Sequence, residues 1–76
     1  NALGDIQNHF DTLSPREREV FERIAAGQAN QSVAIELGIS ERTVEIHRSQ
    51  VMKKMGARSL AQLVRMKIDL DRETAH

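Results

Sequence analysis

The feature that most constrains the fold is a three-residue turn, Gly38-Ile39-Ser40, between two short stretches with helical periodicity. Gly38 can adopt the positive φ that ends a helix, and Ser40 is a favourable N-cap for the next one. Ile39 and Val44 occupy the two positions of a hydrophobic staple across that cap. Ala34, four residues before Gly38, is small where two helices must cross closely. Together these signals predict a helix-turn-helix.

Start and stop signals elsewhere in the chain predict two further helices. Ser14 and Glu17 have the spacing of a capping box around Pro15, which suits a first helical turn. Asn30 is the expected cap of the helix that ends at Gly38. Ser59 and Gln62 form a second possible capping box. The four expected helices cover residues 15–26, 31–37, 41–55 and 60–70, with no strand. We therefore expect an all-α fold, a four-helix bundle built on a helix-turn-helix.

The domain organisation follows from these signals. Residues 1–12 show no sustained helical or strand periodicity, and we interpret them as the remnant of a linker. Residues 13–70 form one small domain, and residues 71–76 form a C-terminal tail. A chain of 76 residues has room for one small core.

Composition excludes several classes of protein. Without cysteine, the chain has neither a disulfide framework nor a thiolate site, which fits a cytoplasmic protein. No apolar run approaches the roughly 20 residues that cross a bilayer, so no membrane contact is expected. His9 and His76 have no partners at metal-ligand spacing, and no nucleophile and base or phosphate-cradling loop is visible. We expect no metal, no cofactor and no enzymatic activity.

The net charge is zero, but its distribution is uneven. Residues 1–40 hold six acidic and three basic side chains, whereas residues 41–58 hold two acidic and five basic ones. The third expected helix therefore lies in the basic part of the chain. A basic segment of this kind favours binding to the phosphates of a nucleic acid.

The third helix has two distinct faces when it is wound at about 100° per residue. The inward stripe, with His47 at its edge, holds Val44, Arg48, Val51 and Met55. The opposite face collects Arg42, Glu45, Ile46, Ser49 and Lys53. In a major groove, an arginine can bind guanine, a glutamate can accept from the cytosine amine, and an apolar side chain can contact a thymine methyl. This mixture predicts a helix that reads double-stranded DNA.

At this point the chain resembles the LuxR-type (NarL/FixJ-type) regulators, and more closely their FixJ-like response regulators. The resemblance covers residues 13 to about 68, through LSPREREV, the A-x-x-x-G turn and SERTVEIHRSQVMKKMGARS. It implies a LuxR-type helix-turn-helix DNA-binding domain, the C-terminal output domain of a two-component response regulator that controls transcription. It also implies an N-terminal phosphoacceptor receiver domain in the full-length protein.

The resemblance also implies roles for individual residues. The positions expected to contact bases are Glu45, Ile46 and Ser49. Those expected near phosphates are Asn30, Thr43, His47, Arg48 and Lys53, to which we add Arg42 and Arg58. Two alternatives stay open: His47 contacts a phosphate or packs as a structural histidine, and Arg58 binds a phosphate or closes its loop. Many relatives carry lysine at the position of Glu45, so a non-specific attraction is lost there.

The last helix carries more apolar residues than one small core can cover. We expect it to support a homodimer on DNA, with Leu63 and Met66 as exposed anchors. The alternative is that the receiver domain or its linker covers this surface. A second functional hypothesis is a protein-interaction module that contacts RNA polymerase, as the similar sigma-factor region does, with DNA secondary.

Overall fold

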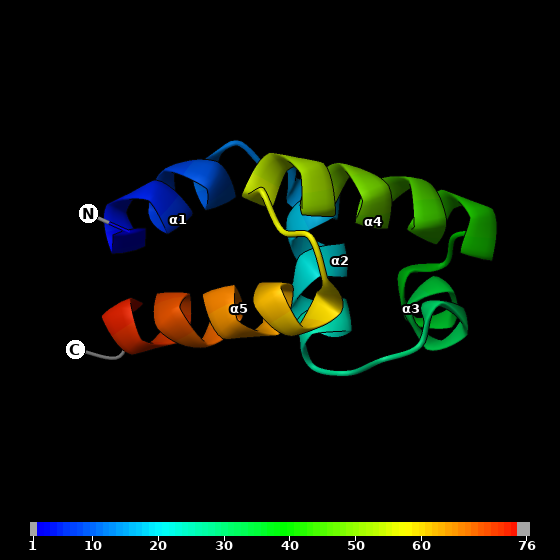
Figure 1. Ribbon diagram of the computed structural model, residues 1–76. Helices are drawn as coiled ribbons and strands as arrows, with labels where there is room; N and C mark the ends of the chain where they lie inside the picture. Colours follow the sequence, from blue (N-terminus) through cyan, green and yellow to red (C-terminus); the bar gives the residue numbers. More distant parts are fainter. Residues whose placement is uncertain (1, 75–76) are drawn as a thin grey trace.

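The computed structural model of the chain describes residues 2–74, which form five helices and no strand (Figure 1). The helices are α1 (Ala2–Asp11), α2 (Pro15–Ala25), α3 (Asn30–Leu37), α4 (Glu41–Met55) and α5 (Leu60–Thr74). The all-α fold and the helix-turn-helix formed by α3 and α4 are confirmed. None of the described helices is long and apolar enough to span a membrane.

Helix α4 runs along one side of the molecule and packs against α1, α2 and α3, whereas α5 packs mainly against α1 and α2 (Figure 1). Behind α4 lies α2, and these two helices share the most extensive contact in the bundle. One end of the molecule is formed by α3, and the other by α1 and α5 (Figure 1). This arrangement leaves the outer side of α4 uncovered by any other described helix.

Buried apolar side chains from α2 to α5, together with Leu13, form one core. Its largest fully buried members are Phe21, Ile24, Met55, Leu63, Val20, Val33, Val44 and Val51. Burial of such side chains is the main stabilising contribution in a domain of this size.

The predicted caps at the starts of α2 and α4 are confirmed, whereas the Ser59–Gln62 box is formed only in part, because Gln62 Oε1 accepts from the Arg58 N–H. Ser14 and Glu17 form both hydrogen bonds of a capping box at the start of α2. Ser40 Oγ accepts from the Thr43 backbone N–H at 3.1 Å, which fixes the start of α4. Gly38 and Gly56 end α3 and α4 in the left-handed region, at φ of 68° and 70°. Because a side chain is strained at such angles, glycine defines where both helices stop.

The expectation that the first residues lack regular structure is wrong for Ala2–Asp11, which form α1. Its Ile6 and Phe10 lie one turn apart and pack against the core. The Phe10 ring lies 5.7 Å from that of Phe21, and the Arg18 guanidinium lies 4.8 Å from the Phe10 ring centre. Leu3, Ile6 and Phe10 recur at helical spacing, but over fewer than three turns, and so short a helix is stable only with tertiary contacts. Whether this segment belongs to a linker stays a prediction.

Two further boundaries differ from the sequence predictions. Asn30 is not an N-cap but the first residue of α3, because its side chain bonds to Arg48 and Ala29 precedes the helix without a side-chain cap. The last helix continues to Thr74, so most of the expected tail is helical. Residues 75–76, which include His76, lie outside the described residues.

Candidate nucleic-acid interface

The orientation of α4 about its own axis is set by its buried face. Val44, Val51 and Met55 are fully buried against the core, as the helical winding predicts. A rotation of α4 would expose these side chains to water and would cost the free energy of their burial. The opposite face is therefore held in a fixed direction.

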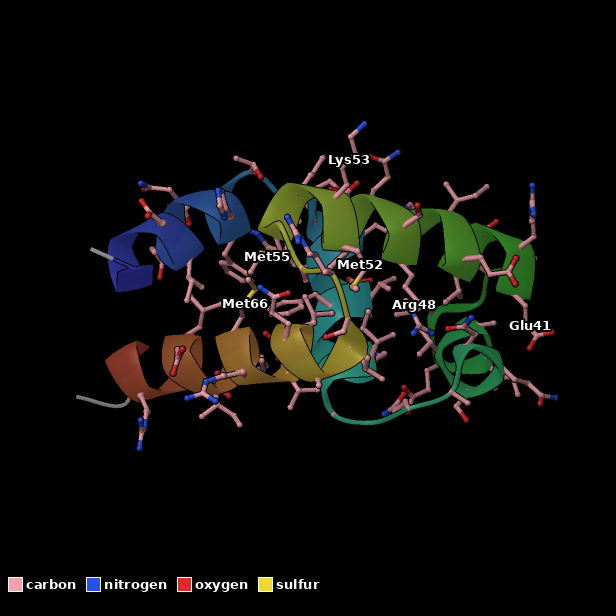
Figure 2. The ribbon with its side chains drawn as sticks, viewed as in Figure 1. Glu41, Arg48, Met52, Lys53, Met55 and Met66 are labelled. Carbon is pink, nitrogen blue, oxygen red and sulfur yellow. The ribbon has the colours of Figure 1, made fainter. Side chains whose placement is uncertain are left out.

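The outward face of α4 presents the predicted mixture of side chains. All five of its predicted members are exposed: Arg42, Glu45, Ile46, Ser49 and Lys53. Ile46 leaves 51% of its surface accessible, and Lys53 points away from the bundle (Figure 2). A groove-facing helix uses such side chains as hydrogen-bond donors, hydrogen-bond acceptors and apolar contacts to base edges.

Charge on this face is partly paired. The Arg42 guanidinium lies 3.8 Å from the Glu45 carboxylate one turn along the helix. Both side chains are exposed, so the pair contributes little to stability. The pair nevertheless places the Arg42 cation beside Glu45, the only carboxylate among the predicted base-contacting residues. This cation reduces the repulsion between Glu45 and a nearby phosphate.

Arg48 lies between the buried stripe and solvent. It points toward α3 (Figure 2), where its Nη1 donates to Asn30 Oδ1 at 3.2 Å. The two residues were both predicted near phosphates, and the fold brings them together from positions 18 residues apart. Because an arginine has five N–H donors, this bond leaves donors for another acceptor.

The remaining predicted phosphate contacts occupy the first half of α4 and the loop that follows it. Thr43 and His47 are partly buried on one flank of the helix. Thr43 Oγ1 lies 2.9 Å from Ser40 Oγ, so this hydroxyl takes part in the cap of α4. Arg58 has an exposed side chain, while its backbone N–H donates to Gln62 Oε1 at 2.9 Å and closes the loop before α5. Their roles toward DNA stay predictions.

The prediction that Leu63 and Met66 are exposed anchors is wrong. Leu63 is fully buried in the core, and Met66 packs against the core on the side of α5 that faces α4 (Figure 2). The apolar residues on the outer side of α5 are instead Leu60, Val64 and Ile68, of which Ile68 is 51% exposed. These three recur every four residues, so they form a single stripe on the helix. Periodicity alone could not distinguish the two stripes, because both are apolar.

An ion pair that no sequence pattern predicts joins α2 to α4. Lys54 Nζ lies 2.8 Å from Glu17 Oε1, and Glu17 is only 7% exposed. The hydrogen bond from Lys54, followed by that from the Ser14 backbone N–H, holds the pKa of Glu17 below its usual value near 4.5. The predicted capping box already accounts for Glu17, and no local pattern indicates its second partner 37 residues away.

Arg16 and Glu19 form an exposed ion pair at 3.0 Å, which is an ordinary solvated helix surface. Among the described residues, no group of three or more potential ligands from histidine, aspartate and glutamate could hold a metal ion.

Residues 11–67 of the chain match a family of bacterial regulatory proteins, the luxR family. The chain is 52% identical over 65 residues to Nodulation protein W of Bradyrhizobium diazoefficiens, and 54% identical over 63 residues to the transcriptional regulatory protein FixJ of Rhizobium meliloti. These matches cover 86% and 83% of this chain, but only 29% and 31% of the two relatives. The chain therefore spans less than a third of their length.

The fold is also similar to a solved structure. The solution structure of the C-terminal transcriptional activator domain of FixJ from Sinorhizobium meliloti matches with a TM-score of 0.74 at 52% identity. The match covers 86% of this chain and 82% of that domain. Similarity therefore extends over most of that domain.

Proposed function

Because the chain belongs to the luxR family of bacterial regulatory proteins, we propose that it binds double-stranded DNA in a sequence-specific manner and thereby controls transcription. Within a longer protein, it would serve as the C-terminal output domain of a two-component response regulator. The observation that carries this proposal is the outward face of α4, which the buried face fixes in direction. Glu45, Ile46 and Ser49 on that face would contact bases.

Phosphate contacts would surround these base contacts. Arg42 and Lys53 lie on the exposed face itself, whereas Thr43 and His47 lie on one flank and Arg48 on the other. Asn30 would contribute from α3, through its bond to Arg48. Arg58 follows α4 and would reach the same backbone. Contacts of this kind position the helix without reading sequence.

A receiver domain would precede this chain. The relatives are more than three times as long as the matched part, which leaves room for such a domain. Phosphorylation of the receiver would then control the output domain.

Two copies would pair on DNA through the outer stripe of α5. The pairing surface in this proposal consists of Leu60, Val64 and Ile68. It does not include Leu63 and Met66, because those two side chains face the core. A two-fold dimer would place two recognition helices in successive major grooves.

A second proposal is contact with RNA polymerase. It is supported by Ile35 on α3, which is 75% exposed and lies in the acidic part of the chain. Replacing Ile35 by serine should then reduce transcription in a reconstituted assay while leaving DNA affinity unchanged. Equal loss of both would argue against a separate polymerase contact.

Titration against random duplexes at low and physiological salt tests the main proposal. A DNA-binding domain should bind and should lose affinity steeply as salt rises, because bound phosphates release counterions. Selection of duplexes from a random pool should then yield a preferred half-site. A chain that binds no duplex at low salt would contradict the proposal.

A further inference from the structure

Lys54 lies on the same flank of α4 as two of the proposed phosphate contacts. It follows Thr43 by eleven residues and His47 by seven, which places all three within about 40° of one another around the helix axis. All three are partly buried, as expected at the edge between the core and solvent. A lysine at this position would ordinarily extend the row of phosphate contacts.

Glu17 holds this lysine toward the bundle. Its Oε1 accepts from Lys54 Nζ and from the Ser14 backbone N–H, both at 2.8 Å. The Glu17 side chain is buried and fixed by the capping box, so it cannot follow Lys54 outward. The Lys54 side chain remains 36% exposed, and its stem could turn toward solvent if Glu17 released it.

Given the proposed function, we infer that Glu17 limits the sequence-independent affinity for DNA, because it holds the charge of Lys54 back from the DNA backbone. Binding to random sequence depends chiefly on the number of cations that reach phosphates, whereas discrimination depends on base contacts. Removing one available cation therefore lowers affinity for all sequences and leaves discrimination to Glu45, Ile46 and Ser49. The neighbouring Lys53, which is exposed, supplies its charge without this restraint.

The test is the salt dependence of binding to a duplex of random sequence. Glu17→Gln retains an acceptor for the Ser14 N–H but removes the charge that holds Lys54. We expect its plot of log affinity against log salt to be steeper than wild type by about 0.9, the contribution of one phosphate contact. Between 50 and 200 mM salt, this equals a further loss of roughly threefold to fourfold. At the lowest salt, the variant should bind more tightly than wild type.

Two controls separate this effect from a change in net charge. Glu19→Gln makes the same charge change on α2, at an exposed residue paired with Arg16, and should alter the slope much less. In a Lys54→Gln background, Glu17→Gln should no longer steepen the slope. Persistence of the effect in that background, or an equal effect of Glu19→Gln, would overturn the inference.

Circular dichroism should verify that each variant is folded at the temperature of the binding assay. If Glu17→Gln does not fold, Glu17→Asp withdraws the carboxylate by one methylene and should give a slope between wild type and the full effect. A folded variant whose slope equals that of wild type overturns the inference. Failure of wild type to bind any duplex would instead contradict the proposed function itself.

Discussion

Arg48 on α4 donates a hydrogen bond to Asn30 on the first turn of α3, with 3.2 Å between Nη1 and Oδ1. This bond joins the two helices of the helix-turn-helix at a point distant from the turn. Any phosphate held by Arg48 would therefore be positioned relative to both helices. Lys53, in contrast, extends freely from the outer face (Figure 2).

We expect Arg48→Ala and Lys53→Ala each to weaken binding to all duplexes about equally, because phosphate contacts carry no sequence information. Each should reduce the salt slope by roughly one unit. Only Arg48→Ala should also lower the melting temperature, since it alone removes a partly buried hydrogen bond. A change in the preferred base with an intact slope would reassign that residue to base contact.

Glu17→Gln should lower the melting temperature at pH 7 by several degrees, on the order of 1 kcal/mol in a domain of this size. The pKa of Glu17 lies below 4.5 in the folded state. Its charged form therefore stabilises the fold above that pH, and this stabilisation disappears as the pH falls through the folded-state pKa. The difference in melting temperature between wild type and Glu17→Gln should thus shrink as the pH falls from 5 through the folded-state pKa of Glu17. A difference that stays constant over this range would show that the ion pair does not cause it.

Phe10→Ala should lower the free energy of unfolding by about 2 kcal/mol, less than for a fully buried phenylalanine because Phe10 is partly exposed. It would lose contact with the Phe21 ring and the Arg18 guanidinium. Asn8→Ala, at an exposed position of the same helix, should change stability by less than about 0.5 kcal/mol. Urea denaturation measures both. Equal effects would mean that α1 does not pack stably on the core.

Local signals in the sequence were sufficient for much of this fold. Gly38 ends α3, and Ser40 and Gly56 determine the limits of α4, all through bonds to nearby backbone groups, so spacing alone places them. The faces of α4 follow from its period because one face is apolar and the other polar. No such contrast separates the two apolar stripes of α5, and the assignment of Leu63 to the outer side was therefore wrong.

Long-range contacts were beyond the reach of the same reasoning. The bonds of Asn30 to Arg48 and of Glu17 to Lys54 depend on how the helices cross, which no local pattern encodes. The helix α1 depends in the same way on the core surface that receives Phe10.

Ile68→Ser should abolish cooperative binding to a duplex with two half-sites and leave binding to a single half-site unchanged. Ile68 is exposed on the outer stripe of α5, where a second copy would bury it. Ile35→Ser removes an equally large apolar side chain from α3 and should leave cooperativity intact. Sedimentation with the two-site duplex provides the measurement. Unchanged cooperativity in Ile68→Ser would show that pairing does not use this stripe.

The sharpest test of the interface is Ile46, whose exposed side chain lies on the outward face between Glu45 and Ser49. Its exposure means that folding gains little from a branched apolar residue there, whereas a thymine methyl offers it a partner in the major groove. Ile46→Ala should leave the melting temperature nearly unchanged, within about 0.5 kcal/mol of stability. It should cost on the order of 1 kcal/mol in affinity for the selected half-site and much less for random duplex.

Val51→Ala provides the matched comparison, because Val51 is a branched apolar residue on the buried face of the same helix. Its truncation leaves a cavity in the core, so it should lower the melting temperature markedly. Thermal unfolding and titration of both variants against selected and random duplexes separate the two roles. Equal weakening of Ile46→Ala on both duplexes would show that Ile46 does not read sequence, since a base contact must distinguish the selected site from the rest.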